Sequence, residues 1–469
     1  MSWNYRKIVG APDEVPEEHR LKRSLGWPHL IFLGVGAIVG TGILVLIGTA
    51  ADKAGPAMML SFLIAGVICA AAALAYAEVA TMIPASGSAY TYSYVVFGEL
   101  IAWFVGWSLI LEYSLVVSAV SVGWSGYFSP LVGIPEALAT APALGGVFNF
   151  PAVFIIAVIA GALVIGLRES ANLNSFLVAV KMLALLMFVV IALTAFNGDF
   201  FEPFMPYGFA KHGPPGEEVG VMAAAAIIFF AFYGFDAIAT AAEEAKNPSR
   251  DLAIGIVGSM LVCVVIYMAV GAAAIGAEPY QRFAKGADPL AQILRDIGWP
   301  VASKLLALSA SVGLPTVILA FFYGQSRIFL AMSRDGLLPG RLARLSGRRN
   351  PVRITLFTAV VVGILAGLVP LNELVALANA GTLTAFIAVC AAMLVMRRRD
   401  PDAKRTFRTP VPMFTGLLGI LGCAYLFYSL PRHTQEWFLI WNSAGLVLYF
   451  LFAAGNAKRV RGPATSDAV

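Results

Sequence analysis

Residues 34–42 read GVGAIVGTG, which places four glycines in nine positions. They lie inside an apolar run from about Leu30 to Ala50 that is long enough to cross a bilayer. Glycine costs a helix interior about 1 kcal/mol relative to alanine, and broken backbone within a membrane persists only where protein or a watery cavity satisfies its polar groups. The stretch therefore indicates a site rather than a plain membrane helix.

Three interpretations of this stretch compete. The spacing resembles a dinucleotide-binding loop, but such a loop needs a preceding strand and an acidic residue about 20 positions further on, whereas position 61 is a serine in another apolar run. Gly36 and Gly40 also form a GxxxG pattern, which lets membrane helices pack closely. In the third interpretation the helix is discontinuous, and its exposed amides bind an anionic ligand group in the middle of the membrane. The rest of the chain has to decide between them.

The composition of the whole chain is that of a polytopic membrane protein. Of its 469 residues, 59% are hydrophobic and 13% are charged, and the mean hydropathy is +0.82, whereas charged residues make up about 25% of a soluble protein. The net charge of +5 does not indicate a nucleic-acid partner, because the basic residues lie in short loops between apolar runs. The cysteines and histidines are scattered, so we expect no disulfide, no metal site and no cofactor.

Twelve apolar segments follow one another along the chain, each of about the length that a membrane span needs. We expect no cleavable signal sequence, because the polar leader runs directly into a full-length span. The approximate spans are 28–50, 55–82, 98–128, 150–168, 173–196, 219–242, 252–276, 301–332, 353–370, 372–396, 411–430 and 436–456.

The basic residues predict the orientation of these spans. With a cytoplasmic N-terminus, 24 Lys and Arg residues fall on the cytoplasmic side and 6 on the other, while Lys181 and Lys304 lie within spans. By the positive-inside rule we expect both termini in the cytoplasm and the protein in a plasma or bacterial inner membrane. No loop is long enough for a soluble domain. The outer loops 129–149 and 197–218 are candidates for short lids, and the inner stretch 84–90, which reads PASGSAY, either tucks against the bundle or serves as an ordinary connector.

Span six carries a second unusual stretch, five spans after the first. Residues 227–236 read IIFFAFYGFD, an aromatic cluster around a glycine with an acid two residues further on. Such aromatics alone would fit a lipid-facing surface or core packing, but an ionisable residue such as Asp236 is costly in a membrane and normally faces the bundle interior. Transporters built from inverted repeats carry broken helices at corresponding positions of their two halves. The pair of interruptions therefore favours the discontinuous helix.

Three motifs occur in order along the chain: residues 34–43, the run GFDAIAT at 234–240 with EEAKNP at 243–248, and GQSRI at 324–328 with AMSRDGLLP at 331–339. With these motifs, about residues 25–400 resemble the amino acid-polyamine-organocation (APC) transporters. Residues 111–113 (LEY) and 123–125 (GWS) resemble their bacterial-type cationic amino acid transporter branch. The resemblance implies an all-α polytopic membrane protein with twelve transmembrane helices and the leucine-transporter fold. Helices 1–5 and 6–10 would then be inverted repeats with helices 1 and 6 discontinuous.

The resemblance divides the chain into two repeats and flanking segments. It leaves the oligomeric state open between a monomer and a homodimer. The expected segments are a cytoplasmic leader at 1–27, repeat 1 (helices 1–5) at 28–196, an extracellular loop at 197–218, repeat 2 (helices 6–10) at 219–396, a basic cytoplasmic loop at 397–410, helices 11–12 at 411–456 and a cytoplasmic tail at 457–469.

The resemblance also implies where a substrate binds. An unwound helix exposes amide donors at one broken end and carbonyl acceptors at the other, and the half-helix dipole favours an anion at its positive end. The resemblance places the substrate carboxylate on the amides of Gly40, Thr41 and Gly42, with the Thr41 hydroxyl as a further donor. The carbonyls that it places near the substrate ammonium are those of Ile38, Phe230, Ala231 and Tyr233.

Mostly apolar or small residues are candidates for the surroundings of the substrate side chain, which favours neutral, small to medium L-amino acids. An arginine or lysine substrate would leave a buried cation in need of a partner, for which Glu112 is the obvious candidate; we interpret Glu112 as structural or pocket-shaping, and a cationic substrate stays the alternative. Phe230 and Phe235 flank the interruption and are candidate outer gates, Phe230 first, with core packing as the alternative. The candidate pocket residues are Ile38, Val116, Ser118, Phe232, Phe235 and Leu314.

Span five contains Lys181 about nine residues from the cytoplasmic loop, which is roughly 13 Å deep at 1.5 Å per residue. A lysine at this depth either anchors the span by reaching towards the surface or is buried and able to gain and lose a proton at physiological pH. In sodium-coupled members of the fold, a cation bridges spans one and eight beside span five, and the resemblance places the Lys181 ammonium there. It would donate to the carbonyl of Gly36 or Ala37, near Thr316, and make the proton the coupling ion.

We therefore expect a secondary active amino acid transporter in the lipid bilayer, working by alternating access with proton symport, and no catalytic residues. Amino acid exchange is the alternative mode. A non-transporting sensor would normally carry a long cytoplasmic tail, a channel needs a continuous polar lining, and an enzyme needs a nucleophile, a metal or paired acids. Pro315 either frees a carbonyl for the coupling site or bends span eight. Glu78 and Asp236 are expected to take part in inner hydrogen bonding or gating.

Overall fold

The apolar runs form helices because a membrane offers the backbone no water, and an α-helix satisfies its own amides and carbonyls. The computed structural model describes residues 5–7, 25–83, 87–165, 171–236, 238, 245–284, 286–340 and 351–461. Over these ranges the chain forms helices and turns with two isolated backbone bridges, Leu25 with Ala245 and His212 with Val219, and no strand. The predicted all-α class is confirmed.

Eight helical stretches in the described ranges are long and apolar enough to cross a membrane, and four further apolar helices are shorter. The long stretches are α3 (Leu46–Ala54) with the turn η4 (Gly55–Ala57) and α4 (Met58–Met82), α6 (Glu99–Val132), α8 (Ala171–Ala192), α11 (Pro248–Ala277), α14 (Pro300–Arg334), α16 (Leu371–Arg399), α17 (Pro412–Ser429), and α18 (Arg432–Leu448) with the π-helical turn η11 (Tyr449–Ala453) and α19 (Ala454–Arg461). The shorter ones are α1 (Trp27–Ile38), α7 (Phe150–Ile165), α9 (Val221–Ile228) with the 3-10 turn η9 (Phe229–Ala231), and α15 (Val352–Leu368).

Both stretches that the sequence singles out interrupt their helices. The first span ends as α1 at Ile38, resumes as the short helix α2 (Thr41–Leu44) and continues into α3. In span six, helical structure stops after η9, and Gly234 has a φ of +124°, a backbone conformation that favours glycine. Residues 237 and 239–244, which include part of the GFDAIAT and EEAKNP motifs, lie outside the described residues.

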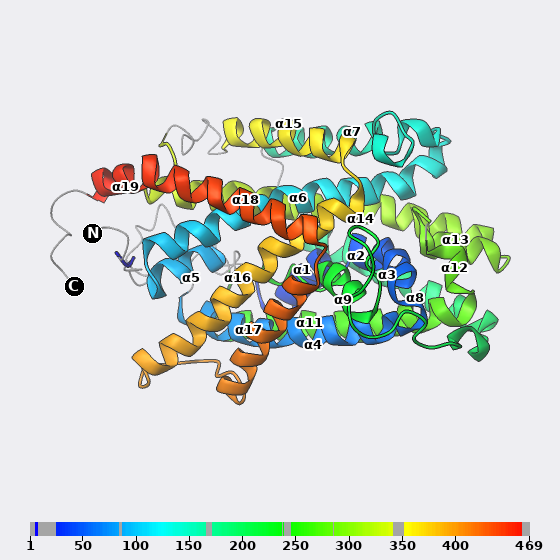
Figure 1. Cartoon of the computed structure of the whole chain (residues 1–469), viewed down its shortest axis with the longest axis horizontal. Coiled ribbons are helices and arrows are strands. Elements are labelled where there is room, and N and C mark those ends of the chain that lie inside the picture. The colour runs from blue at the N-terminus through cyan, green and yellow to red at the C-terminus, as the bar shows by residue number, and fades with distance from the viewer. Residues whose placement is uncertain are drawn as a thin grey trace.

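The two interruptions lie in the interior of the helix bundle, where α6 packs against α14 and α16, and α1 packs against α11 and α8. Figure 1 shows α19 at one end of the molecule and two short helices, α12 (Tyr280–Phe283) and α13 (Pro289–Asp296), at the opposite end. Helices α7 and α15 run side by side along one edge, and α17 packs against α16 and α4. The two interruptions therefore lie among long helices.

The outer surface of the bundle is apolar. Helix α8 exposes Leu183, Leu186 and Val190, and α15 exposes Phe357 and Val360. Large exposed apolar surfaces are unusual on monomeric soluble proteins, whereas lipid tails cover them at no cost. This surface agrees with a protein embedded in a membrane.

Two parts of the chain hold helices that the sequence analysis did not predict. Of the inner stretch 84–90, residues 84–86 lie outside the described residues, but the remainder leads into α5 (Ser88–Val96), which is buried against α6 and α16. The described part therefore tucks against the bundle. Between α11 and α14, the chain forms α12 and α13. The loops 129–149 and 197–218 contain the 3-10 turns η5 (Glu136–Leu138), η6 (Pro142–Leu144) and η8 (Gly198–Phe201), and the 3-10 turn η7 (Leu193–Ala195) ends the span that begins with α8.

Candidate substrate and coupling site

The first interruption leaves backbone amides open to the interior. Val39 is extended and Gly40 has φ −151° and ψ −142°, so α2 begins with amides that have no preceding helical turn to bond with. Within the described residues, the amides of Gly40, Thr41 and Gly42 donate no hydrogen bond, and the buried Thr41 hydroxyl has no partner. Four donors are thus available for an anionic group.

The second interruption leaves carbonyls open. Two carbonyls of α9, those of Ala226 and Ile227, accept from Nδ2 of Asn379 on α16, at 2.8 and 2.9 Å. Further along, the Phe232 carbonyl accepts from Sγ of Cys69 at 3.4 Å. The carbonyls of Phe230, Ala231 and Tyr233 accept no hydrogen bond from the described residues. They are available for a cationic group.

A small cavity of about 10 Å³ lies between the two interruptions. This is room for roughly one water molecule, so the site is closed around a space smaller than an amino acid. The approach of the two segments depends on Gly42, because a Cβ at that position would lie 2.3 Å from the Cα of Ala231. The lining residues are Ala37, Ile38, Gly40, Thr41, Gly42, Val116, Val120, Phe230, Tyr233, Val317 and Phe321.

Several candidate pocket residues lie outside this lining. Leu314 is fully buried next to Gly40, and the ring of Phe235 lies 5.5 Å from that of Tyr76 and 5.1 Å from that of Phe386. Ala231 packs against Gly42, Phe232 packs against Tyr267, and the Ser118 hydroxyl donates to the Val362 carbonyl. Of the two candidate gates, Phe230 lines the cavity and Phe235 belongs to an aromatic cluster away from it.

Three lining residues were missed from the sequence. Val120 is one helical turn beyond Val116 on α6, and Val317 and Phe321 follow Leu314 at helical spacing on α14. Residues three, four or seven apart share one face of a helix. Extending each candidate by one or two turns would have found all three.

The side chain of Lys181 on α8 bonds with the backbone of the first interruption. Its side chain is 3% exposed, and Nζ donates to the carbonyls of Gly36 at 2.8 Å and Val39 at 3.0 Å. The aliphatic stem crosses α14 at Gly313, where a Cβ would lie 2.5 Å from Cγ and Cδ of the lysine. The ammonium thus connects α8 to α1 while its stem packs on α14.

The other residues expected at the coupling site lie differently. Ala37 lines the cavity, and the second carbonyl bound by the lysine belongs to Val39. The Thr316 hydroxyl donates to the Gly313 carbonyl of its own helix at 2.8 Å. The carbonyl of Ile38, expected to meet the substrate, already accepts from the Tyr267 hydroxyl of α11 at 2.9 Å. Lys181 and Tyr267 therefore hold three carbonyls within four residues.

Comparison with known proteins assigns the chain to a family. The amino acid permease family model matches residues 25–452. The chain belongs to the amino acid permease family, within the APC superfamily. It is 44% identical over 452 residues to the branched-chain amino acid permease BcaP of Bacillus subtilis, covering 94% of this chain and 95% of the relative.

Two more relatives extend the comparison. The permease is 40% identical to the methylthioribose transporter of Bacillus subtilis, over 92% of this chain and 94% of the relative. It is 37% identical to the vacuolar cationic amino acid transporter 2 of Arabidopsis thaliana, over 86% of this chain and 65% of the relative. The named relatives are transporters, so transport is also the activity of the family to which this chain belongs.

A buried acidic cluster of the permease lies beside the second interruption. The Tyr113 hydroxyl donates to Oδ2 of Asp236 at 2.7 Å, and Glu112, the preceding residue on α6, is 1% exposed and packs against Gly381 of α16. Neither acid lines the cavity. Asp236 is thus held by α6 directly after the second interruption, while Glu112 lies between α6 and α16.

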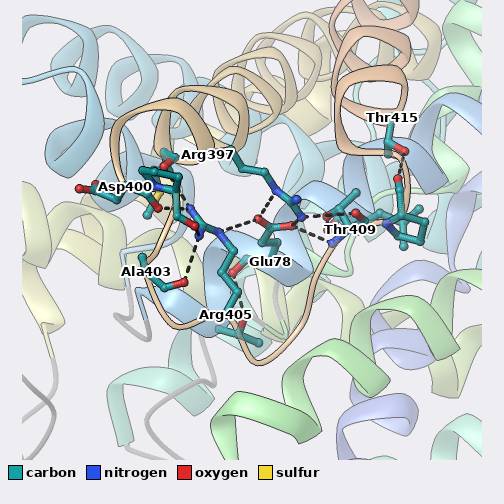
Figure 2. Close-up of polar contacts among 12 residues, drawn as sticks. Glu78, Arg397, Asp400, Ala403, Arg405, Thr409 and Thr415 are labelled. Atoms are coloured by element: carbon teal, nitrogen blue, oxygen red, sulfur yellow. Dashed lines mark hydrogen bonds and ion pairs between the residues drawn. The ribbon is translucent and has the colours of Figure 1, made fainter.

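Glu78 has a separate position, near the end of α4. Figure 2 shows its carboxylate between Arg397 at the end of α16 and Arg405 in the following loop. Arg397 donates from Nε to Oε1 at 2.8 Å and from Nη2 to Oε2 at 2.6 Å, and the Thr409 amide donates to Oε2 at 2.7 Å. With Nε of Arg405 3.3 Å from Oε1, Glu78 ties α4 to α16 and to the segment that leads into α17.

Proposed function

We propose that this permease is a proton-coupled symporter of neutral, small to medium L-amino acids. One observation carries the proposal: open amides of one broken helix and open carbonyls of another meet at a cavity whose other walls are apolar. A zwitterion beside an apolar side chain is the solute that matches both kinds of surface.

The backbone groups would read the part that all α-amino acids share. The substrate carboxylate would accept from the amides of Gly40, Thr41 and Gly42, whose preceding turn is missing. The ammonium would donate to the open carbonyls of Phe230, Ala231 and Tyr233. Because Ile38 already bonds with Tyr267, it would contribute at most its second lone pair.

The substrate class follows from the cavity walls. None of the residues that line the cavity is charged, and Val116, Val120, Val317 and Phe321 supply an apolar surface. A cationic substrate would bury its charge there without a partner, which is costly. The branched-chain specificity in the name of the 44% identical relative supports the same class. Cationic substrates, in the name of the plant relative, are the alternative.

Lys181 would carry the coupling proton. Its ammonium bonds with two carbonyls of the first interruption, and hydrogen bonds from a charged donor are worth about 1.5–3 kcal/mol each. Loss of the proton would remove the charge and weaken the link between α8 and the end of α1. Proton release towards the cytoplasm would then free α1 to move.

Transport requires the closed cavity to open to each side in turn. The eight long and four shorter apolar helices support twelve spans, with five-helix inverted repeats meeting at the two interruptions. The positive-inside rule supports cytoplasmic termini. Phe230 would act as the outer gate because it lines the cavity. A monomer and a homodimer could both work in this way, because the cavity is formed by one chain.

Uptake by purified protein in liposomes tests the proposal. We expect radiolabelled branched-chain amino acids to accumulate under an inward proton gradient without sodium, and arginine and lysine to compete poorly. Sodium-dependent uptake indifferent to a pH gradient would refute proton coupling, and uptake that needs amino acid inside would establish an exchanger. Competition by methylthioribose instead of amino acids would refute the substrate class, and binding without flux would identify a sensor.

A further inference from the structure

The segment between α11 and α14, residues 278–299, packs against α3. Figure 1 shows its helices α12 and α13 at the end of the molecule opposite α19. Phe283, Leu290 and Leu294 of this segment are fully buried. The contact with α3 is close, because a Cβ at Gly48 would lie 3.0 Å from the Ala284 carbonyl oxygen. Since α3 continues the first interruption, any outward movement of α3 has to displace this segment.

A buried carboxylate lies at the start of the segment. The Glu278 side chain is 3% exposed, and neither of its oxygens accepts a hydrogen bond from the described residues. The guanidinium of Arg282 lies 3.6 Å from Oε1, but the Arg282 side chain is 69% exposed. An ionised carboxylate in such a place loses its hydration without gaining hydrogen bonds in exchange. A proton on Glu278 would remove this cost.

A second carboxylate, that of Asp296, lies on α13, which packs against α11. Burial first, and the neighbouring carboxyl of Asp296 on α13 second, raise the pKa of Glu278 to about 7, with Arg282 opposing them. The other charged groups around this end have partners or lie on separate elements: Arg295 pairs with Asp288 at 2.7 Å, and Lys53 donates to the Glu218 carbonyl. The remaining ones on neighbouring elements are Asp52 on α3, Asp199 on η8 and the exposed Lys304 on α14, and Lys285 lies outside the described residues.

We propose that Glu278 and Asp296 form a proton-binding site that fastens α13 to the end of α11 and so keeps residues 278–299 packed against α3. The protonated Glu278 hydroxyl donates to the Asp296 carboxylate and so connects the end of α11 to α13. This site is distinct from Lys181: its proton locks the segment and is not carried with the substrate. When the proton leaves, two carboxylates repel each other, and the segment separates more readily from α3.

The direction of the pH effect follows from the raised pKa. The closed segment binds a proton that the open segment, with an ordinary carboxylate, releases. The proton therefore contributes its full stabilisation of the closed segment below about pH 4.3, the ordinary pKa of a glutamate side chain. This stabilisation is lost as the pH rises through about 7, the pKa of Glu278 in the closed segment.

Cysteine accessibility in the full-length protein tests the lock. The native cysteines in the described ranges are buried, so an Ala291→Cys variant, at a fully buried position of α13, reports opening through its reaction with a membrane-impermeant maleimide. An exposed Glu136→Cys variant corrects for the pH dependence of the reagent. After this correction, we expect roughly tenfold slower labelling at about pH 6 than at about pH 8. Adding Glu278→Gln, which keeps the shape of the protonated acid, should make the rate low at both pH values.

Infrared spectroscopy gives an independent readout. A protonated carboxyl band should titrate near pH 7, disappear in Glu278→Gln and titrate at lower pH in Asp296→Asn. Corrected labelling equal at both pH values, or an unchanged band in Glu278→Gln, would overturn the proposal. Neither readout requires transport, so a failure of proton-coupled uptake would leave this test intact, and the reverse also holds.

Discussion

The two interruptions differ in the side chains that satisfy their broken backbone. At the first, Lys181 and Tyr267 donate to the carbonyls of Gly36, Val39 and Ile38. At the second, the amide of Asn379 and the thiol of Cys69 donate to carbonyls of Ala226, Ile227 and Phe232. Among the described residues, only the first interruption depends on a donor that carries a full charge.

This difference assigns different tasks to the two segments. A charged donor strengthens a hydrogen bond and can be switched off by loss of a proton, whereas an amide donor is permanent. We therefore expect the first interruption to change its connections during transport, and the second to serve as a fixed platform for the substrate ammonium. Variants at each donor test this comparison.

The largest effect is expected from Lys181→Ala, which removes the charged donor from the first interruption. Two hydrogen bonds from a charged group are lost, about 3 kcal/mol or more, which corresponds to roughly a hundredfold in an equilibrium. Accumulation driven by a proton gradient should fall by about this factor in liposomes. Counterflow of labelled amino acid, which needs no gradient, should be retained in part.

Lys304→Ala is the matched control, because this lysine is exposed on α14. It removes the same side-chain atoms and the same charge at a position that makes no contact with the first interruption. Gradient-driven accumulation by Lys181→Ala at the level of Lys304→Ala would show that the two interruptions do not differ in the way proposed.

The second largest effect is expected where the two interruptions touch. In Gly42→Ala, the new methyl group would lie 2.3 Å from the Ala231 Cα, and overpacking of this kind costs about 1–3 kcal/mol. We expect transport to fall by about fivefold to a hundredfold, with normal amounts of protein in the membrane. Gly161→Ala, with open space around its Cβ position on α7, is the control; equal transport by both variants would exclude close approach at Gly42.

The positions of both interruptions were predictable because their sequences carry backbone information. Glycine is unfavourable within a helix, so its clustering at 34–42 indicates that this part of the span is not a regular helix. The depth of Lys181 along span five left anchoring and burial open, and the family resemblance predicted its contact with the carbonyl of Gly36 or Ala37. The contact with Gly36 is present. The glycine cluster and the depth of Lys181 can be read along one helix, whereas this contact needed the resemblance.

The donors from other helices could not be predicted in this way. Tyr267 lies in the middle of a long apolar span, where nothing in the pattern indicates which neighbour its hydroxyl reaches. Asn379 left a signal, since an amide inside a membrane span needs a partner, but its acceptors lie more than 150 residues earlier in the chain. Similarly, α12 and α13 are short helices between spans, and their burial against α3 depends on tertiary packing rather than local pattern.

A smaller effect is expected from Asn379→Ala at the second interruption. It leaves the carbonyls of Ala226 and Ile227 without their side-chain donor, which costs about 1–3 kcal/mol. Because the lost donor carries no proton that titrates, the thermal stability of the detergent-solubilised protein should fall by the same amount at every pH where the protein is folded. A loss of stability that varies with pH would contradict the assignment of the second interruption as a fixed platform.

The smallest effect is expected from Tyr267→Phe, which removes the neutral donor to the Ile38 carbonyl at the first interruption. The ring stays packed against Phe62 and Phe232, so only the bond to the Ile38 carbonyl is lost, about 1 kcal/mol. This frees a carbonyl at the cavity without disturbing Lys181, and the substrate ammonium gains an acceptor. We therefore expect proton coupling to persist, with a change of about fivefold or less in the apparent substrate affinity. Coupling is measured as uptake with and without a pH gradient. Its loss in this variant would mean that Tyr267 and Lys181 act as one unit. The charge of Lys181 alone would then not distinguish the first interruption from the second.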